Sequence, residues 1–252
     1  MCGRYAITSV PEAIRALFGY PETPNFPPRY NIAPTQPIPV VRMTEGQRSF
    51  ALLRWGLIPS WVKDPRAFSL LINARGESVL DKPAFRNAMK RRRCLVPADG
   101  FYEWKQDGDR KRPFFVRARG GPVAFAGLWE TWMGPNGEEM ETACIVTTAA
   151  NRSLRALHDR MPVVIPPEAF ELWLDAGRVD AQTAAALIAP APETLFEAYE
   201  VSTAVNRTAN DSAVLIAPIS PAAAASPEPD SASRKPVRRA KRTKDGGQSS
   251  LF

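Results

Sequence analysis

The sequence contains very little histidine and cysteine. His158 is the only histidine among 252 residues, so any imidazole chemistry has a single candidate. Cys2, Cys94 and Cys144 are odd in number, and their spacings suit neither a disulfide framework nor a zinc site. We therefore expect a protein of a reducing, cytosolic compartment that holds no metal ion and no cofactor.

Long apolar runs are also absent. No segment approaches the ~20 apolar residues that a membrane-spanning helix needs, and the polar start lacks the apolar centre of a signal peptide. We therefore expect no membrane association. The hydrophobic share of 44% is ample for a packed core, and the chain contains no internal repeat.

The net charge of +7 is spread unevenly along the chain. Residues 218–252 carry 7 of the 33 Lys and Arg but only 3 of the 26 Asp and Glu, so the rest of the chain is mildly basic. Residues 218–247 are rich in Pro, Ala, Ser, Lys and Arg and nearly lack bulky apolar side chains. Such a composition cannot bury enough surface to fold. We place the domain boundary near Ile219, with a disordered basic linker at 220–247.

Short apolar runs between turn signals predict a domain built mainly of strands. We expect strands around 2–9, 38–43, 50–56, 94–98, 113–118, 122–129, 141–148 and 197–203. Helices are expected from Pro11 to a stop at Gly19, and at 83–93, 151–157, 167–175 and 180–189. Many short strands with few helices predict a single α+β domain, residues 2–219, with a strongly curved, barrel-like, mainly antiparallel sheet flanked by short helices.

Cys2 stands directly after the initiator methionine, and its own side chain is small enough to favour removal of Met1. A terminal cysteine carries a thiol with a reference pKa of about 8.5 and an α-amine of about 7.7 on adjacent carbons. The amine can form an imine with an aldehyde, and the thiolate can then add to the imine carbon to close a five-membered thiazolidine. The alternative is that Cys2 is an ordinary residue at the start of a strand.

Four stretches place polar groups among apolar neighbours: MCGR at the start, INAR, GFYEW and LHDRMP. Glu103, between two aromatic residues, either faces solvent by alternation or lies in a pocket that raises its pKa and suits it to proton transfer. Asn73 is either a turn residue or an orienting amide. His158 is structural or catalytic, and the arginines of these stretches are solvated, ion-paired or ligand-binding.

Six motifs occur in a fixed order along the chain. They are Met-Cys-Gly-Arg at 1–4, Tyr-Asn-Ile-Ala-Pro at 30–34, WGLIPSW at 55–61, NARGE at 73–77, PADGFYEW at 97–104 and HDRMP at 158–162. This series closely resembles the SRAP family, the SOS response-associated peptidase-like or abasic site processing proteins. The resemblance runs from residue 2 to about 218 and includes Val205-Asn206 and Asn210-Asp211.

The resemblance implies a protein that binds single-stranded DNA containing an abasic site, whose sugar opens to an aldehyde. Cys2 would capture that aldehyde as a thiazolidine crosslink and so shield the lesion during replication and the SOS response. Asn73 would hold the cysteine or the opened sugar, and Glu103 would be the acid and base of the imine step and ring opening, an AP-lyase-like reaction. His158 would assist proton transfer, including reversal of the crosslink.

The resemblance also implies DNA contacts. Three arginines would grip phosphates, and a proline and a tryptophan would stack on or wedge the bases beside the lesion. These residues are Arg4, Arg75 and Arg160, with Pro34 and Trp61. The chain departs from the family pattern at Val62, where some members carry a second aromatic residue, and at Ser78, where Thr is common. We expect a monomer associated with the bacterial nucleoid and replication fork.

Two other classes of function suit the same motifs. One is an N-terminal-nucleophile hydrolase, either a glutamine amidotransferase, whose chains also open with Met-Cys-Gly, or a peptidase that exposes its own Cys2. The former needs a glutamine pocket and a partner synthase. The other class is a plain single-strand-binding module, which would bind intact and abasic DNA equally and reversibly.

The C-terminal tail carries two further signals. Its basic run at 234–244 is either a solubilising tail or a non-specific attraction to DNA phosphates. At its end, residues 248–252 read Gln-Ser-Ser-Leu-Phe. Gln248, Leu251 and Phe252 resemble the peptide by which bacterial DNA-processing proteins dock on the replication sliding clamp. Tethering there would raise the local concentration of the domain at stalled forks.

Overall fold

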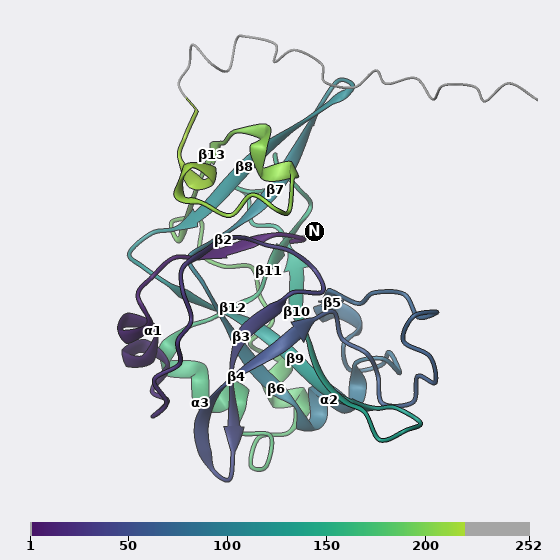
Figure 1. The fold of residues 1–252 in the computed structure, drawn as a ribbon. Coiled ribbons are helices and arrows are strands. Elements are labelled where there is room, and N and C mark those ends of the chain that lie inside the picture. The colour runs from purple at the N-terminus through teal and green to yellow at the C-terminus, as the bar shows by residue number, and fades with distance from the viewer. Residues whose placement is uncertain (1, 220–252) are drawn as a thin grey trace, which may run out of the picture. The chain divides into compact units, whose positions relative to one another are not determined.

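The computed structural model of the chain describes residues 2–219. The predicted linker at 220–247 and the candidate clamp peptide with Gln248, Leu251 and Phe252 lie outside these residues. Two sheets make up the described chain, and Figure 1 shows one above the other.

The lower sheet closes into a five-stranded barrel, because its strands pair in the order β10-β4-β3-β6-β9 and β9 pairs again with β10. These strands are β3 Pro37–Thr44, β4 Gln47–Trp55, β6 Arg93–Ala98, β9 Val123–Met133 and β10 Glu139–Ala149. The β10–β4 pair is parallel and the other four pairs are antiparallel. The predicted curved, barrel-like, mainly antiparallel sheet is thus confirmed.

Three short strands extend the barrel wall. They are β5 Asn73–Arg75, β11 Arg160–Pro162 and β12 Val164–Ile165. β5 runs parallel to β10, β11 runs antiparallel to it, and β12 pairs with β9. β5 and β11 therefore bring the NARGE and HDRMP motifs to the same central strand.

The barrel interior is the main core. All six residues of β6 are buried, and buried apolar residues of β3, β4, β9 and β10 belong to the same core. The β3–β4 hairpin closes through a two-residue turn in which Glu45 and Gly46 have φ angles of 52° and 81°. Both angles lie in the left-handed region that a type I′ turn requires, and this turn matches the twist of the strands.

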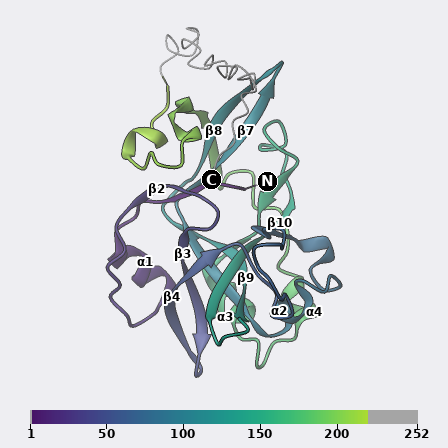
Figure 2. The same cartoon turned by 45° about the vertical axis from the view of Figure 1, so that its right-hand side comes forward.

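The upper sheet has the order β13-β8-β7-β1-β2. Its strands are β1 Tyr5–Ile7, β2 Arg29–Ile32, β7 Gly100–Asp107, β8 Arg110–Ala118 and β13 Phe196–Glu200. β1 pairs with β7 only at Ala6↔Gly100 and Tyr5↔Phe101, so the edge of β7 beyond these residues is not covered by β1. The β7–β8 hairpin projects from the body in both views (Figures 1 and 2).

Short helices flank the two sheets. They are α1 Pro11–Phe18, α2 Arg86–Arg91, α3 Phe170–Leu174 and α4 Ala181–Ala185. Short 3₁₀ helices span Gly76–Ser78, Pro167–Ala169, Thr203–Asn206 and Ala213–Ile216. No helix in residues 2–219 combines the length and the apolar character needed to cross a membrane.

Two helix predictions need correction. The helix predicted over 83–93 spans only Arg86–Arg91, since Arg93 already pairs as the first residue of β6. The helix predicted over 151–157 is wrong, because residues 152–157 form turns. There the backbone hydrogen bonds of helical spacing, from the Arg155 N–H to the Asn151 oxygen and from the His158 N–H to the Leu154 oxygen, are not consecutive, so no regular helix forms.

Candidate active site at the junction of the two sheets

Cys2 is fully buried where the chain enters β1, between the two sheets. Its Sγ lies 3.9 Å from the Arg4 carbonyl oxygen. Burial, and secondarily the Glu103 carboxylate, hold the pKa of the Cys2 thiol far above its ordinary value. The thiol is therefore neutral in the resting site, and its reaction requires a group that removes its proton.

Asn73 is the first residue of β5 and reaches across to the start of the chain. Its Nδ2 donates a hydrogen bond to the Cys2 carbonyl oxygen over 2.9 Å, which fixes Cys2 against the barrel. Its Oδ1 is buried and meets no hydrogen-bond partner within residues 2–219. This oxygen can accept a hydrogen bond from a group that enters the site. The interpretation of Asn73 as an orienting amide is compatible with this one hydrogen bond and stays a prediction.

Glu103 lies on β7 between Tyr102 and Trp104 and is 5% exposed. Alternation directs it away from Tyr102, whose hydroxyl donates to the Tyr30 carbonyl oxygen over 2.6 Å. Burial raises the pKa of the Glu103 carboxyl, and the charge of His158 opposes that shift. A buried carboxyl with a raised pKa can both give and take a proton near neutral pH.

His158 follows the turns at 152–157 and precedes β11. Its Nδ1 accepts a hydrogen bond from the Arg160 backbone N–H over 2.9 Å and lies 2.8 Å from Asp159 Oδ1. The side chain is 30% exposed, so the ring reaches solvent at the site. Its charge acts on Glu103, which identifies the two groups as neighbours.

A cavity of about 410 Å³ opens at this junction. It is lined by Arg4, Glu103, Trp104, Lys111, His158 and Asn206. Sequence reasoning missed Trp104, Lys111 and Asn206 as lining residues. Trp104 and Asn206 stood in motifs that resemble the family, so the motifs held a usable signal, whereas nothing in the sequence around Lys111 indicated a site.

The three predicted phosphate-binding arginines have different surroundings. Arg4 donates to Asn31 Oδ1 and to the Val205 carbonyl oxygen over 2.7 and 2.8 Å. Arg160 forms a bidentate pair with Glu77 over 2.6 and 2.9 Å and also donates to the Thr147 carbonyl oxygen. Both guanidinium groups are thus already hydrogen-bonded to other groups of the protein.

Arg75 is the exception. It is exposed on β5, next to Asn73, and its guanidinium makes no hydrogen bond or ion pair with any residue in 2–219. It is the predicted phosphate-binding arginine that is available to a ligand in this part of the chain.

The two predicted base-contacting residues lie on loops outside the lining of the cavity. Pro34 is half-buried in the turn after β2. Trp61 is 56% exposed and meets Phe68 edge-on, with 5.7 Å between ring centroids. An exposed indole held at its edge by a second ring leaves its face open for stacking.

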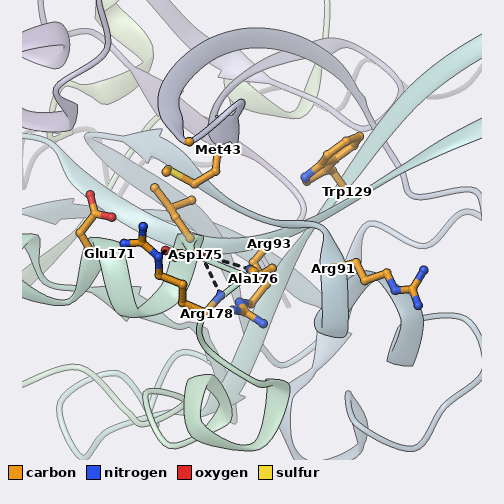
Figure 3. A pocket seen from close by; sticks show the side chains of 11 residues that line it. Met43, Arg91, Arg93, Trp129, Glu171, Asp175, Ala176 and Arg178 are labelled. Atoms are coloured by element: carbon orange, nitrogen blue, oxygen red, sulfur yellow. Dashed lines mark hydrogen bonds and ion pairs between the residues drawn. The ribbon is translucent and has the colours of Figure 1, made fainter.

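A larger cavity, of about 520 Å³, lies at the opposite end of the barrel, near the β3–β4 turn and the start of β6. Figure 3 shows its lining, in which Asp175 Oδ1 accepts hydrogen bonds from the backbone N–H groups of Gly177 and Arg178. None of the predicted site residues lines it. Across residues 2–219, no three His, Cys, Asp or Glu side chains gather in a way that could hold a metal ion.

Comparison with known proteins agrees with the motif order. The family described as SOS response associated peptidase (SRAP) matches residues 1–208. Abasic site processing protein YoqW of Bacillus subtilis (strain 168) is 38% identical over 222 residues, covering 86% of this chain and 99% of that protein. Abasic site processing protein YedK of Escherichia coli (strain K12) is 34% identical, covering 87% and 100%.

The fold also has a close counterpart among solved structures. A crystal structure of a Bacteroides thetaiotaomicron protein superposes with a TM-score of 0.77 and covers 86% of this chain and all of that chain, at 24% sequence identity. At that identity the likeness concerns the fold alone. The family match spans both sheets and all four residues of the proposed catalytic group, Cys2, Asn73, Glu103 and His158. The chain therefore belongs to the SRAP family.

Proposed function

We propose that this protein processes abasic sites in single-stranded DNA by capturing the ring-opened aldehyde on Cys2. The observation that carries the proposal is the burial of Cys2 between the Asn73 amide and the Glu103 carboxyl at the start of the chain. Its relatives YoqW and YedK, which are named abasic site processing proteins, support the substrate. The capture would shield the lesion during replication.

The first step joins the Cys2 α-amine to the aldehyde carbon once Met1 has been removed. The amine forms a C–N bond to the aldehyde carbon. The carbonyl oxygen leaves as water with one proton from the amine and one from Glu103, so that a protonated imine and the Glu103 carboxylate remain. That oxygen must be protonated as it leaves, and Glu103 is the nearest group suited to this because burial favours its acid form. The hydrogen bond from Asn73 to the Cys2 carbonyl oxygen would hold the backbone still during the attack.

The second step adds the thiol across the imine. Sulfur bonds to the former aldehyde carbon, the C=N bond becomes single, the nitrogen keeps its one proton, and the thiol proton passes to the Glu103 carboxylate. Because burial keeps the Cys2 thiol protonated, a base must accept that proton, and the Glu103 carboxylate left by the first step is available. The product is a five-membered thiazolidine. Reversal repeats the same transfers in the opposite order, with His158 assisting.

The surroundings of the cavity suit a single strand. Arg75 offers an uncommitted cation beside Asn73, and Trp61 offers an exposed ring on which a base can stack. Opening the abasic sugar requires no partner base, and an unpaired strand can turn the sugar into a site at the junction of two sheets.

Intact-mass spectrometry of the full chain, mixed with an abasic single-stranded oligonucleotide, tests the proposal. We expect loss of Met1 and a mass gain equal to the oligonucleotide minus one water. Cys2→Ala, or a chain that keeps Met1, should form no heat-stable adduct. Cys144→Ala is the matched control, since it removes a buried cysteine from the barrel and should leave the adduct intact. An undiminished adduct in Cys2→Ala would refute the proposal.

The family description also contains the word peptidase, which favours a second candidate, an N-terminal-nucleophile hydrolase. In that reaction the Cys2 amine would serve as the base for its own thiol. Ammonia release from glutamine, and cleavage of a short leader placed before Cys2, would detect the two forms of this activity. If both assays are negative while the adduct forms, abasic-site capture is the function of the site.

A further inference from the structure

Of the three predicted arginines, only Arg4 lines the site cavity. A captured abasic sugar carries phosphate groups on either side, so donors should lie near it. Arg4 lines the cavity but donates to Asn31 and to a backbone carbonyl, while Arg160 is paired with Glu77. Other lining residues must therefore be considered as phosphate ligands.

Asn206 presents two such donors. The Trp104 indole N–H donates to Asn206 Oδ1 over 2.8 Å. An indole nitrogen is only a donor, so the amide atom that it meets must be the oxygen. The orientation of the amide is thus fixed, and the Nδ2 group projects from the other side, where it meets no acceptor within residues 2–219. Asn206 is exposed and lines the cavity.

Lys111 supplies a positive charge at the same cavity. It lies on β8, two residues before Pro113, which pairs with Trp104 on β7. Alternation therefore puts Lys111 on the same face of the hairpin as Trp104. The neighbouring Arg112 is held by Glu200 and Asp107, but Lys111 forms no ion pair in the described part of the chain.

We propose that Lys111 and Asn206 form a phosphate-binding subsite of this cavity, which holds a phosphate group attached to the captured sugar. The inference rests on the proposed function for the identity of the sugar, but not for the chemistry of the subsite. Lys111 supplies a charge and Asn206 Nδ2 two N–H donors, a set that complements an anion with several acceptor oxygens. Glu103 shares the cavity, and burial, which raises the pKa of its carboxyl, favours the uncharged form that would repel the anion less.

The rigid hydrogen bond from Trp104 gives the subsite its selectivity. Arg4 lies 5.9 Å from the centroid of the Trp104 ring, so the ring is held by a cation on one side and by Asn206 at its edge. A preorganised amide loses little conformational entropy when it binds an anion. The subsite should therefore recognise phosphate attached to a small sugar and not only a long strand.

Nuclear magnetic resonance of the Trp104 indole N–H provides the test, because this group reports directly on Asn206. The full chain is titrated with inorganic phosphate, then with 2-deoxyribose 5-phosphate and 2-deoxyribose 3-phosphate, and Trp104→Phe identifies the signal. We expect a saturable shift with inorganic phosphate. The sugar phosphate that binds with the lower Kd shows whether the subsite binds the phosphate on the 5 or on the 3 position of the sugar.

Substitutions assign the shift to the subsite. Lys111→Ala and Asn206→Asp should each weaken phosphate binding about tenfold or more. Asn206→Asp keeps an oxygen for Trp104 but replaces the N–H donors with a repelling oxygen. Lys105→Ala is the matched control, since Lys105 lies on the same hairpin, pairs with Arg112 and does not line the cavity.

Two results would overturn the subsite: no saturable shift in the natural chain, or the same affinity in Lys111→Ala and Asn206→Asp as in Lys105→Ala. The titration with inorganic phosphate involves no covalent chemistry. It therefore decides the subsite even if the Cys2 adduct fails to form, and the adduct assay decides the proposed function even if phosphate binds elsewhere.

Discussion

The backbone N–H of Arg160 donates a hydrogen bond to Nδ1 of His158 over 2.9 Å. A neutral imidazole whose Nδ1 accepts a hydrogen bond must carry its proton on Nε2. The same Nδ1 lies 2.8 Å from Asp159 Oδ1, a contact that is favourable only when Nδ1 is protonated. The HDRMP motif thus provides one partner for each charge state of the ring, which suits a residue that moves protons in both directions.

The first prediction concerns His158→Gln. The glutamine amide can offer an N–H donor to the cavity but cannot exchange a proton, so release of the crosslink should slow about a hundredfold while DNA binding persists. Transfer of the protein from one abasic oligonucleotide to a labelled competitor measures the release. Asp159→Asn keeps the Arg160 N–H contact but removes the carboxylate that faces protonated Nδ1, so it should slow release by a smaller factor than His158→Gln does. An unchanged transfer rate in His158→Gln would remove His158 from the reaction.

The second prediction concerns the pH dependence of stability at Glu103. Burial raises the pKa of this carboxyl, so the folded state binds its proton more tightly than the unfolded state does. That contribution to stability is fully present below the unfolded pKa of about 4.3 and is lost as pH rises through the folded pKa. Glu103→Gln removes the loss of folding stability that comes from ionising this buried carboxyl at higher pH.

Glu103→Gln should therefore have a higher Tm than the natural chain at pH 8, and the difference should disappear near pH 4. The same variant should form the adduct about a hundredfold more slowly, because the amide cannot donate or accept the proton. Thermal denaturation across this pH range and single-turnover adduct formation measure the two effects. A variant less stable than the natural chain at pH 8 would show that the carboxylate is stabilised in the fold.

The third prediction concerns Asn73. Asn73→Ala removes the hydrogen bond to the Cys2 carbonyl oxygen, so the start of the chain should lose its fixed position. We expect adduct formation to slow by about ten- to a hundredfold, with little change in the affinity for abasic DNA. The dependence of the adduct rate on DNA concentration separates the two quantities. A loss confined to affinity would make Asn73 a binding residue and not a positioning one.

The sequence predicted the barrel and its strands well because strand alternation and turn residues are local signals. The predicted helix stop at Gly19 is confirmed by its left-handed backbone, with a φ of 68°. The turns at 152–157 were predicted as a helix because local propensity does not show that the two backbone hydrogen bonds of helical spacing, Arg155 to Asn151 and His158 to Leu154, are not consecutive.

The site could be predicted only as far as its motifs reached. Glu103 and His158 meet in one cavity, as their motifs indicated, but Lys111 and Asn206 join it through the β7–β8 hairpin and a distant 3₁₀ helix. The sequence shows where the arginines stand but not which of them form hydrogen bonds or ion pairs within the fold. The partner of Arg160 is Glu77, 83 residues away, and no sequence pattern links the two.

The fourth prediction concerns the end of the chain, which lies outside the described residues. Deleting Leu251 and Phe252 should remove micromolar binding to the replication sliding clamp, because these are the apolar side chains of the candidate peptide. Crosslinking to abasic DNA should be unchanged. Surface plasmon resonance on immobilised clamp measures the binding, with Ser249→Ala as the matched control. Clamp binding that survives the deletion would refute the docking role of the peptide.

The fifth prediction separates Arg75 from Arg160, which the sequence placed in one class. Arg75 is exposed and uncommitted, so Arg75→Ala should weaken binding to single-stranded DNA and reduce the slope of log affinity against log salt by about 0.7, with Tm unchanged.

Arg160 is 13% exposed and holds Glu77 and a backbone carbonyl. Arg160→Ala should therefore lower stability by about 1–2 kcal/mol, a fall in Tm of about 2–8 °C, with a smaller change in the salt slope. Salt titrations of DNA binding, together with thermal denaturation of both variants, measure the difference. Equal slopes for the two variants would mean that Arg160 leaves Glu77 to contact phosphate when DNA binds, and Glu77→Gln would then tighten binding by removing its competitor.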